Sequence, residues 1–255
     1  MAEEPIGVPL TIVFEGSEPE DHDLNFYDGA ASLFGFAKTL QLTTHYLKNG
    51  KVAFQAPSAK GVRLVMFPSK PGSYIQPIEI ILNDRVIALP NSIARQGAAT
   101  RRVNRAEVID FTNFMIQRTV GRLSAAPQTT LVQEYSDTVA PDLDALSEAI
   151  DGPLKEAHRA IATRTIREIS LRRRSENFLI LNTASYEYLE FTKISPSVST
   201  KYGSVAAYNV NSRRGRFYEQ ELGRTVPFTP PLRIMILIRH HFPGLWINGP
   251  VGCPA

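Results

Sequence analysis

The sequence predicts an α+β protein in which an N-terminal α+β domain is followed by a small antiparallel, SH3-like β-barrel. Three observations lead to this prediction: one long amphipathic helix pattern, strand patterns on both sides of it, and five short strand patterns after residue 163. The chain has 255 residues, 43% hydrophobic and 21% charged, enough for one large core or two modest ones. We therefore expect an α+β domain at 1–163, the barrel at 164–229 and an atypical tail at 230–255.

The clearest helix pattern begins at Phe26 and ends at Asn49-Gly50, a typical helix stop. Apolar or small side chains recur in it at alternating spacings of three and four residues, which places them on one face of a helix. We expect these residues to form one buried stripe: Phe26, Ala30, Leu33, Ala37, Leu40, Thr44 and Leu47.

Strand patterns lie on both sides of this helix. Residues 9–15 form a β-rich run before it, and residues 61–67 and 73–82 form two more after it. These three runs supply the predicted strands of the N-terminal domain.

Two further helix patterns follow in the N-terminal domain. Asn104 with Glu107 three residues later outlines a capping box and predicts a helix that starts there. Pro141 occupies a favoured first-turn position of another helix, which Pro153 should break or kink. We interpret the polar residues 125–138 between these helices as a linker.

After residue 163 the pattern changes to short strands. Residues 166–171 and 178–181 predict a hairpin, and residues 202–210, 216–218 and 225–228 predict three more strands. Five short strands within about 65 residues are typical of a small antiparallel barrel.

Two segments resemble parts of an uncharacterised bacterial family of unknown function. Residues 23–72 (DLNFYDGAASLFGFAKTLQLTTHYLKNGKVAFQAPSAKGVRLVMFPSKPG) resemble its N-terminal half, and residues 202–228 (YGSVAAYNVNSRRGRFYEQELGRTVPF) resemble the small β-barrel that follows it. The resemblance implies an α+β unit followed by a barrel. It implies no activity and no catalytic residue, and the residues after Phe228 depart from the pattern of the family.

Composition bears on the cellular location of the protein and on whether disulfides or zinc sites stabilise it. The single cysteine, Cys253, excludes an internal disulfide framework and a cysteine-rich zinc site. The longest apolar run, 234–238, is far shorter than the ~20 residues of a membrane helix. The N-terminal residues show no signal-peptide pattern. We therefore expect a cytoplasmic protein that makes no membrane contact.

The familiar enzyme signatures are missing from the sequence. It contains no P-loop, no dinucleotide-binding fingerprint, no nucleophile elbow and no His-Glu-x-x-His zinc motif. This weakens an enzymatic interpretation without ruling it out, because many sites are assembled from distant residues. We favour a non-enzymatic role, assign no catalytic residue and expect no cofactor.

An acidic segment near the N-terminus is the densest group of possible metal ligands. Oxygen-rich groups suit Mg²⁺, Ca²⁺ or Mn²⁺. In a strand, however, only alternate residues share a face, so a complete site would need ligands from elsewhere. A solvated acidic turn is the favoured interpretation of these residues, which are Glu20, Asp21, His22 and Asp23.

Arginine is concentrated in the C-terminal part of the chain. Residues 161–255 hold thirteen basic residues against six acidic ones. Arginine makes bidentate contacts with phosphate and carboxylate groups, and single-stranded nucleic acid favours arginine combined with aromatic residues. The candidate residues for binding an anionic partner are Arg172, Arg173, Arg174, Arg213, Arg214, Arg216 and Tyr218.

These observations favour a non-enzymatic binding or adaptor protein whose basic C-terminal barrel engages an anionic or protein partner. Two alternatives stay open. One is a divalent-metal-dependent hydrolase or transferase that acts on phosphorylated substrates, and the other is a single-stranded nucleic-acid-binding protein. The sequence specifies neither the ligand nor the oligomeric state.

Overall fold

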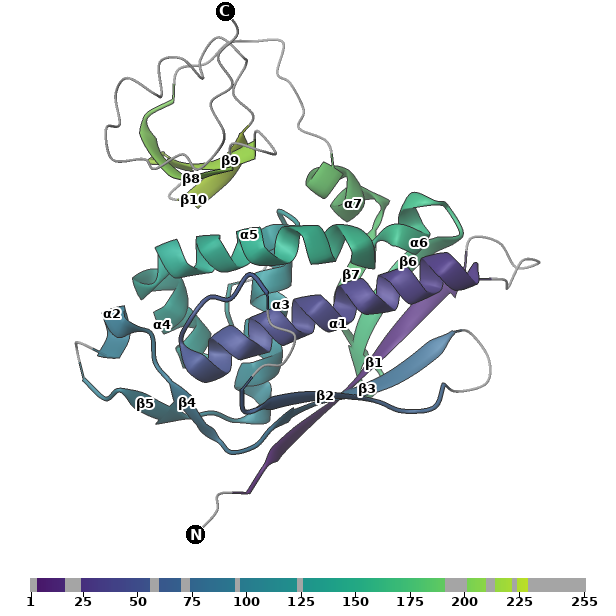
Figure 1. The fold of residues 1–255 in the computed structure, drawn as a ribbon, viewed down its shortest axis with the longest axis horizontal. Coiled ribbons are helices and arrows are strands. Elements are labelled where there is room, and N and C mark those ends of the chain that lie inside the picture. The colour runs from purple at the N-terminus through teal and green to yellow at the C-terminus, as the bar shows by residue number, and fades with distance from the viewer. Residues whose placement is uncertain are drawn as a thin grey trace, which may run out of the picture. The chain divides into compact units, whose positions relative to one another are not determined.

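The computed structural model describes residues 4–16, 24–55, 60–69, 74–94, 97–122, 126–190, 201–209, 214–221 and 224–228. The chain divides into two compact units, Met1–Phe191 and Thr192–Ala255. Figure 1 shows the elements of both. The first unit contains β1 (Ile6–Gly16), α1 (Phe26–Asn49), β2 (Val62–Met66), β3 (Ile75–Leu82), β4 (Val86–Ala88), α2 (Asn91–Ala94), β5 (Thr100–Arg102), α3 (Arg105–Thr119), α4 (Thr130–Thr138), α5 (Ala140–Ala157), α6 (Arg159–Ala162), β6 (Ile166–Arg173), β7 (Glu176–Asn182) and α7 (Thr183–Glu190); the second contains β8 (Gly203–Asn209), β9 (Arg214–Glu219) and β10 (Arg224–Phe228).

A five-stranded sheet in the order β2-β3-β1-β6-β7 forms the centre of the first unit, and every neighbouring pair in it is antiparallel. The three strands predicted at 9–15, 61–67 and 73–82 are present as β1, β2 and β3. Every second residue of β1 from Ile6 to Phe14 is buried in the core, because strand side chains alternate between two faces. β1 therefore connects the two halves of the sheet, which lie on either side of it.

The hairpin predicted for the start of the barrel is present as β6 and β7, but it belongs to this sheet. β6 pairs with β1, so that Leu171 lies opposite Ile12 and Ile169 lies opposite Phe14. All four side chains are part of the buried core. Burial next to β1 thus holds the hairpin in the first unit, and the boundary lies at residue 191 rather than near 163.

The long helix α1 begins and ends close to the residues that the sequence indicates. The Asn25 side chain accepts hydrogen bonds from the backbone N–H groups of Tyr27 and Asp28, which is the usual role of an N-cap residue. At the other end, Gly50 adopts a left-handed conformation with φ of 62° and donates its N–H to the carbonyl of Tyr46. Glycine favours such a position because it lacks a Cβ.

The predicted buried stripe of α1 is correct only in its C-terminal half. Leu40, Thr44 and Leu47 are buried, whereas Phe26 is 90% exposed and Ala30 and Ala37 are also exposed. In the N-terminal half, the buried positions are held mostly by small residues: Gly29, Ser32 and Gly35.

Close packing against α5 and α6 explains the small residues at Gly35 and Ser32. Helices α1 and α5 run side by side in Figure 1, and a Cβ at Gly35 would overlap the backbone of Ala157 and Pro153. The Ser32 hydroxyl accepts a hydrogen bond of 3.1 Å from the backbone N–H of Ala160. Of the break or kink predicted at Pro153, the break is not observed, because α5 continues through this residue while lying against α1.

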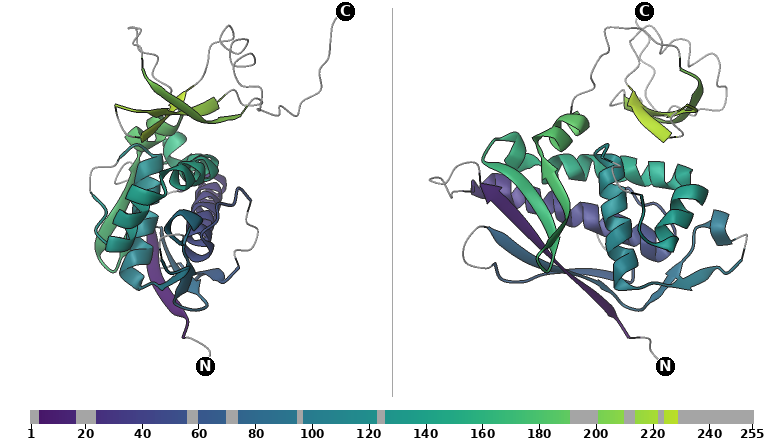
Figure 2. Two further views of the ribbon diagram at one scale, coloured as in Figure 1. Left: turned by 90° about the vertical axis from the view of Figure 1, so that its left-hand side faces the viewer. Right: turned by 180° about the vertical axis from the view of Figure 1, so that it is seen from behind.

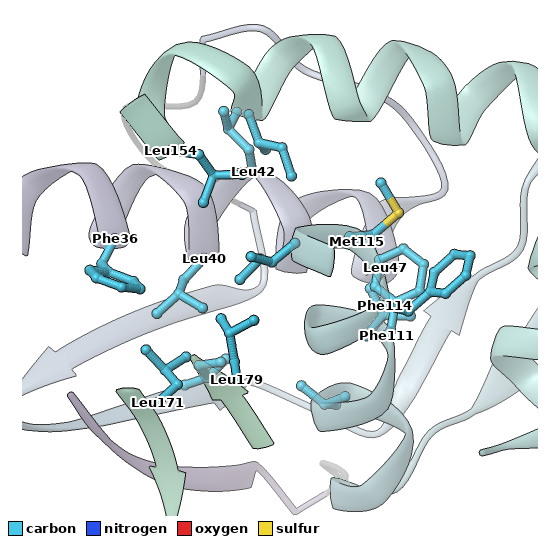
Figure 3. Packing of buried hydrophobic residues seen from close by; sticks show 14 of the residues in the cluster. Phe36, Leu40, Leu42, Leu47, Phe111, Phe114, Met115, Leu154, Leu171 and Leu179 are labelled. Carbon is cyan, nitrogen blue, oxygen red and sulfur yellow. The ribbon is translucent and has the colours of Figure 1, made fainter. Parts of the chain in front are cut away.

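Three buried aromatic side chains join α1, α3 and α4. The Tyr46 and Phe111 rings stack with centroids 5.9 Å apart, and the Tyr135 ring meets both edge-on. Each such pair adds about 0.5–1.5 kcal/mol beyond the burial of its area. Figure 3 shows Phe111 next to Leu47. Since Tyr135 lies in α4, the segment 125–138 contributes a helix to the core and is not the polar linker that we predicted.

Side-chain hydrogen bonds cap the start of α3 and hold the residues just before α4. The predicted capping box is confirmed: the Asn104 side chain accepts from the Glu107 N–H at 3.1 Å, and the Glu107 carboxylate accepts from the Asn104 N–H at 2.9 Å. The Asp110 carboxylate accepts hydrogen bonds from the backbone N–H groups of Gln128 and Thr129 and from the Thr129 hydroxyl. Asp110 therefore ties α3 to the residues that lead into α4.

The second unit contains a three-stranded antiparallel sheet in the order β10-β9-β8. Its strands match the three predicted at 202–210, 216–218 and 225–228. The predicted closed SH3-like barrel is not found within the described residues, because its first hairpin has joined the sheet of the first unit. The tail predicted at 230–255 lies outside the described residues.

A pair of substitutions in α1 tests which of its faces is buried. Leu40 is 1% exposed and Phe34 is 60% exposed. A buried unpaired carboxylate is costly, so Leu40→Asp should lower the free energy of unfolding by more than about 3 kcal/mol. Phe34→Asp should change it by less than about 1 kcal/mol. Urea denaturation measures both, and equal losses would mean that α1 buries a different face.

Candidate functional site

The large sheet has two chemically different faces. Residues such as Val8 and Ile80 lie on the face that packs into the core with the helices. The strand positions between them carry polar and charged residues, including Thr11, Glu79 and Arg172. Figure 2 shows α1 and α5 together on one side of the sheet. The opposite face is therefore where polar side chains of several strands come together.

A depression of about 550 Å³ lies on this polar face. The Glu79 carboxylate leans over Gly7 of β1, where a Cβ would overlap it. Arg63 is exposed on β2, and within the described residues neither Arg63 nor Glu79 has a hydrogen-bond or ion-pair partner. The depression thus offers a guanidinium and a carboxylate to a ligand. It is lined by Pro5, Gly7, Arg63, Glu79, Ile81 and Asn83.

The arginine cluster at 172–174 lies at the turn between β6 and β7, as the sequence indicates. The Arg172 guanidinium forms an ion pair with the Glu15 carboxylate and donates a 3.0 Å hydrogen bond to the Ser170 hydroxyl. Arg173 and Arg174 are exposed, and Arg174 has a left-handed backbone with φ of 55°. The charge of Arg172 is therefore compensated within the sheet, whereas its two neighbours face solvent.

The second arginine cluster belongs to the other unit. Arg214 and Arg216 lie in β9, and Tyr218 is half-buried on the same strand. Arg213 lies outside the described residues. The two arginine clusters therefore belong to separate units of the chain.

The predicted metal ligands Glu20, Asp21, His22 and Asp23 also lie outside the described residues. Among the residues that the structure does describe, no group of three or more His, Cys, Asp or Glu side chains is placed to hold a metal ion. The first acidic residue of α1, Asp28, forms an ion pair of 3.1 Å with Arg159.

A buried histidine joins α5 to α7. The His158 Nδ1 lies 2.6 Å from the Leu154 carbonyl oxygen, and its Nε2 lies 2.8 Å from the Ser185 hydroxyl oxygen. Both side chains are 0% exposed, so this serine–histidine pair does not face a substrate. Burial lowers the pKa of His158 to about 4, which keeps the ring neutral at physiological pH.

Sequence reasoning missed the residues of the depression. Arg63 and Glu79 are the only charged residues within β2 and β3, and an isolated charge in an otherwise apolar strand was the available signal. The pattern did not show that the two residues share a face, because this depends on the register of β2 and β3. That register is a property of the folded sheet.

The first unit defines an α+β domain, with an antiparallel sheet that buries one face against helices and leaves polar residues on the other. The chain belongs to the family described as a domain of unknown function, DUF7946, which matches residues 10–190. This range coincides closely with the first unit, which ends at Phe191. No curated protein and no solved structure matches the chain. None of the helices in the described residues is both long and apolar enough to cross a membrane.

The buried histidine predicts a specific loss of stability in acid. The pKa of His158 in the folded protein, about 4, lies below its ordinary value of 6.5, so the unfolded chain takes up this proton first as the pH falls. Its contribution to stability is therefore complete above about pH 6.5 and is lost between there and about pH 4.

The variant His158→Gln isolates this contribution. At pH values under 6.5, the free energy of unfolding of the wild type should decrease as the pH is lowered. His158 should contribute up to about 1.4 kcal/mol per pH unit to this decrease. The variant should lack that part of the decrease, as measured by urea denaturation at a series of pH values. Parallel pH profiles for the two proteins would contradict a neutral buried ring.

Proposed function

We propose that the protein is a non-enzymatic binding or adaptor protein whose C-terminal unit engages an anionic partner through β9. The observation that supports this proposal is the spacing of Arg214, Arg216 and Tyr218, which occupy alternate positions along the strand. Alternate positions of a strand share one face of its sheet. Two basic positions and an aromatic one therefore form a row on the central strand of the three-stranded sheet.

Apolar residues occupy the intervening positions of the same sheet. Phe217 lies in register with Val205 on one side and Val226 on the other. This row lies on the face opposite to the arginine positions, by the same alternation. The sheet thus carries an apolar row at Phe217 on one face and the arginine positions on the other.

The residues in register with the arginine row carry no charge. Arg216 is in register with Ala207 and Pro227, and Tyr218 is in register with Ser204 and Thr225. Oppositely charged cross-strand neighbours would stabilise the arginines within the sheet, and these neutral ones do not. The arrangement suits contacts with an external anion.

The acidic residues of this sheet are engaged elsewhere. Glu219 lies one position beyond Tyr218, and its carboxylate forms a 2.6 Å ion pair with Lys201. Lys201 also lies 2.9 Å from Glu221, and hydrogen bonds to both carboxylates raise the pKa of Lys201 to about 12. A lysine outside β9 therefore binds both of these carboxylates.

Single-stranded nucleic acid is the second candidate function, and Tyr218 favours it. A base can stack on an aromatic side chain while neighbouring arginines contact the phosphates. Tyr218 is half-buried and in register with the small residues Ser204 and Thr225, which supports this candidate. The third alternative, a divalent-metal-dependent hydrolase or transferase, depends on residues 20–23 outside the described part of the chain.

A triple substitution tests the arginine surface. Replacing Arg213, Arg214 and Arg216 by Ala should weaken binding to an anionic partner. If these arginines form the proposed binding surface, the free energy of unfolding should change by no more than about 0.5 kcal/mol, as is typical of surface substitutions. With nucleic acid, the variant should also reduce the salt dependence of binding by roughly one slope unit per lost phosphate contact. Fluorescence anisotropy with single-stranded DNA, RNA and duplex DNA at about 50 and about 200 mM salt measures both effects.

The same measurement separates the candidate partners. The double variant with Arg173 and Arg174 replaced by Ala serves as a matched control from the first unit. No binding of any nucleic acid at the lower salt would reject the nucleic-acid proposal. Poly-glutamate then serves as the anionic probe, and failure of the wild type to bind it as well would reject the arginine surface altogether.

A further inference from the structure

Within the described residues, one edge of the large sheet is covered and the other has no pairing strand. The edge strands are β2 and β7. Beside β7, the Arg122 guanidinium donates hydrogen bonds to the Ile180 carbonyl and to the Asn182 side chain, and α7 packs against the strand. Among the described residues, β2 pairs only with β3. Unpaired N–H and C=O groups along such an edge are a template for another strand.

The register shows which backbone groups of β2 point outward. The Asn83 N–H bonds to the Gly61 carbonyl at one end of the β2–β3 pair, and the Phe67 N–H bonds to the Pro77 carbonyl at the other end, both at 3.0 Å. In an antiparallel pair only every second residue bonds to its partner strand. The bonded positions of β2 are therefore the odd-numbered ones. The even-numbered residues direct their N–H and C=O groups away from β3: Val62, Leu64 and Met66.

We infer that β2 is a docking edge for an extended acidic peptide, which adds to the sheet as a further strand. Backbone hydrogen bonds to the three outward-facing residues would supply affinity, and alternate side chains of the peptide would supply specificity. The edge is accessible, since Met66 is 67% exposed and Arg63 is also exposed.

The positive charges around β2 favour an acidic peptide as the partner. Lys60 and Arg63 are exposed, and residues 60–67 include no acidic residue. Glu79, the carboxylate on the next strand, leans over Gly7 of β1 and thus away from β2. Arg63 is consequently available to a carboxylate on an added strand, where directly opposed side chains have Cβ atoms about 4.5–5.5 Å apart.

The apolar residues of β2 define the remaining positions of the peptide. Val62 and Leu64 pack against the core on the helix side of the sheet, and Met66 lies at the end of the same row. A docked strand would continue this row with its own apolar side chains. Acidic side chains would alternate with them and face the depression next to Arg63.

The same charges disfavour a second copy of the chain as the occupant. Two β2 strands paired antiparallel about Leu64 would place each Arg63 opposite Val65 of the other copy and diagonally adjacent to the other Arg63. Like charges this close are unfavourable, and charged edge residues commonly prevent self-pairing of sheets.

The experiment compares two substitutions at Met66. Met66→Pro removes an outward N–H without removing a bond to β3, because those bonds come from the odd-numbered residues. Met66→Ala removes the same side chain and keeps the N–H. The probe is a fluorescent, terminally blocked peptide of alternating valine and glutamate, and its matched control carries lysine in place of glutamate. Circular dichroism and thermal melting establish that both variants are folded.

Strand addition predicts a distinct pattern of fluorescence anisotropy. Met66→Pro should weaken binding of the glutamate peptide by about tenfold or more, the effect of one lost hydrogen bond, while Met66→Ala should stay within about threefold of wild type. Arg63→Glu should reverse the preference toward the lysine peptide. The Arg213, Arg214 and Arg216 triple variant should still bind the glutamate peptide, and Met66→Pro and Arg63→Glu should have the same effects in that background, which distinguishes this edge from the C-terminal arginines.

Four outcomes of the peptide measurements would overturn the inference. These are no binding of the glutamate peptide by the wild type, equal binding of the lysine peptide, binding unaffected by both Met66→Pro and Arg63→Glu, and binding lost in the C-terminal triple variant. A dimer in analytical ultracentrifugation that Met66→Pro disrupts would also overturn it, because the edge would then be occupied by a second copy.

Discussion

The burial of one face of β1 between two partner strands is the constraint on which the first unit depends. β1 pairs with β3, which follows α1, and with β6, which follows the remaining long helices. A shift of register by one residue would turn Ile12 and Phe14 out of the core, so burial fixes the register on both sides. The polar face follows from the same constraint, because the positions between the buried ones must face the other way.

This register determines which charges are compensated within the domain. It places Glu15 and Arg172, from distant parts of the chain, on the same face of neighbouring strands, where they form an ion pair. On the other side of β1, the Glu79 carboxylate lies over Gly7 and leaves Arg63 exposed without a partner among the described residues. Two arginines on one sheet therefore differ in availability, because the register places a carboxylate within reach of only one of them.

The extent of the family agrees with the structural division of the chain. The match at 10–190 includes α7, which packs against the edge strand β7, and stops before the three-stranded sheet. The matched domain thus includes the helix that covers one edge strand of its sheet. The arginine row of β9 lies outside the matched range, so the two proposed binding surfaces belong to separate parts of the protein.

The sequence by itself determined most of the local structure: the extent of α1, the capping box of α3, the hairpin of β6 and β7, and the three strands of the second unit. These features depend on residue spacing and on caps within a few positions. The tertiary structure alone decided that β6 joins β1, that small residues of α1 face α5, and that Arg63 and Glu79 share a face. Each of these depends on contacts between segments far apart in the chain, and hydrophobic periodicity shows that a face is buried without showing what covers it.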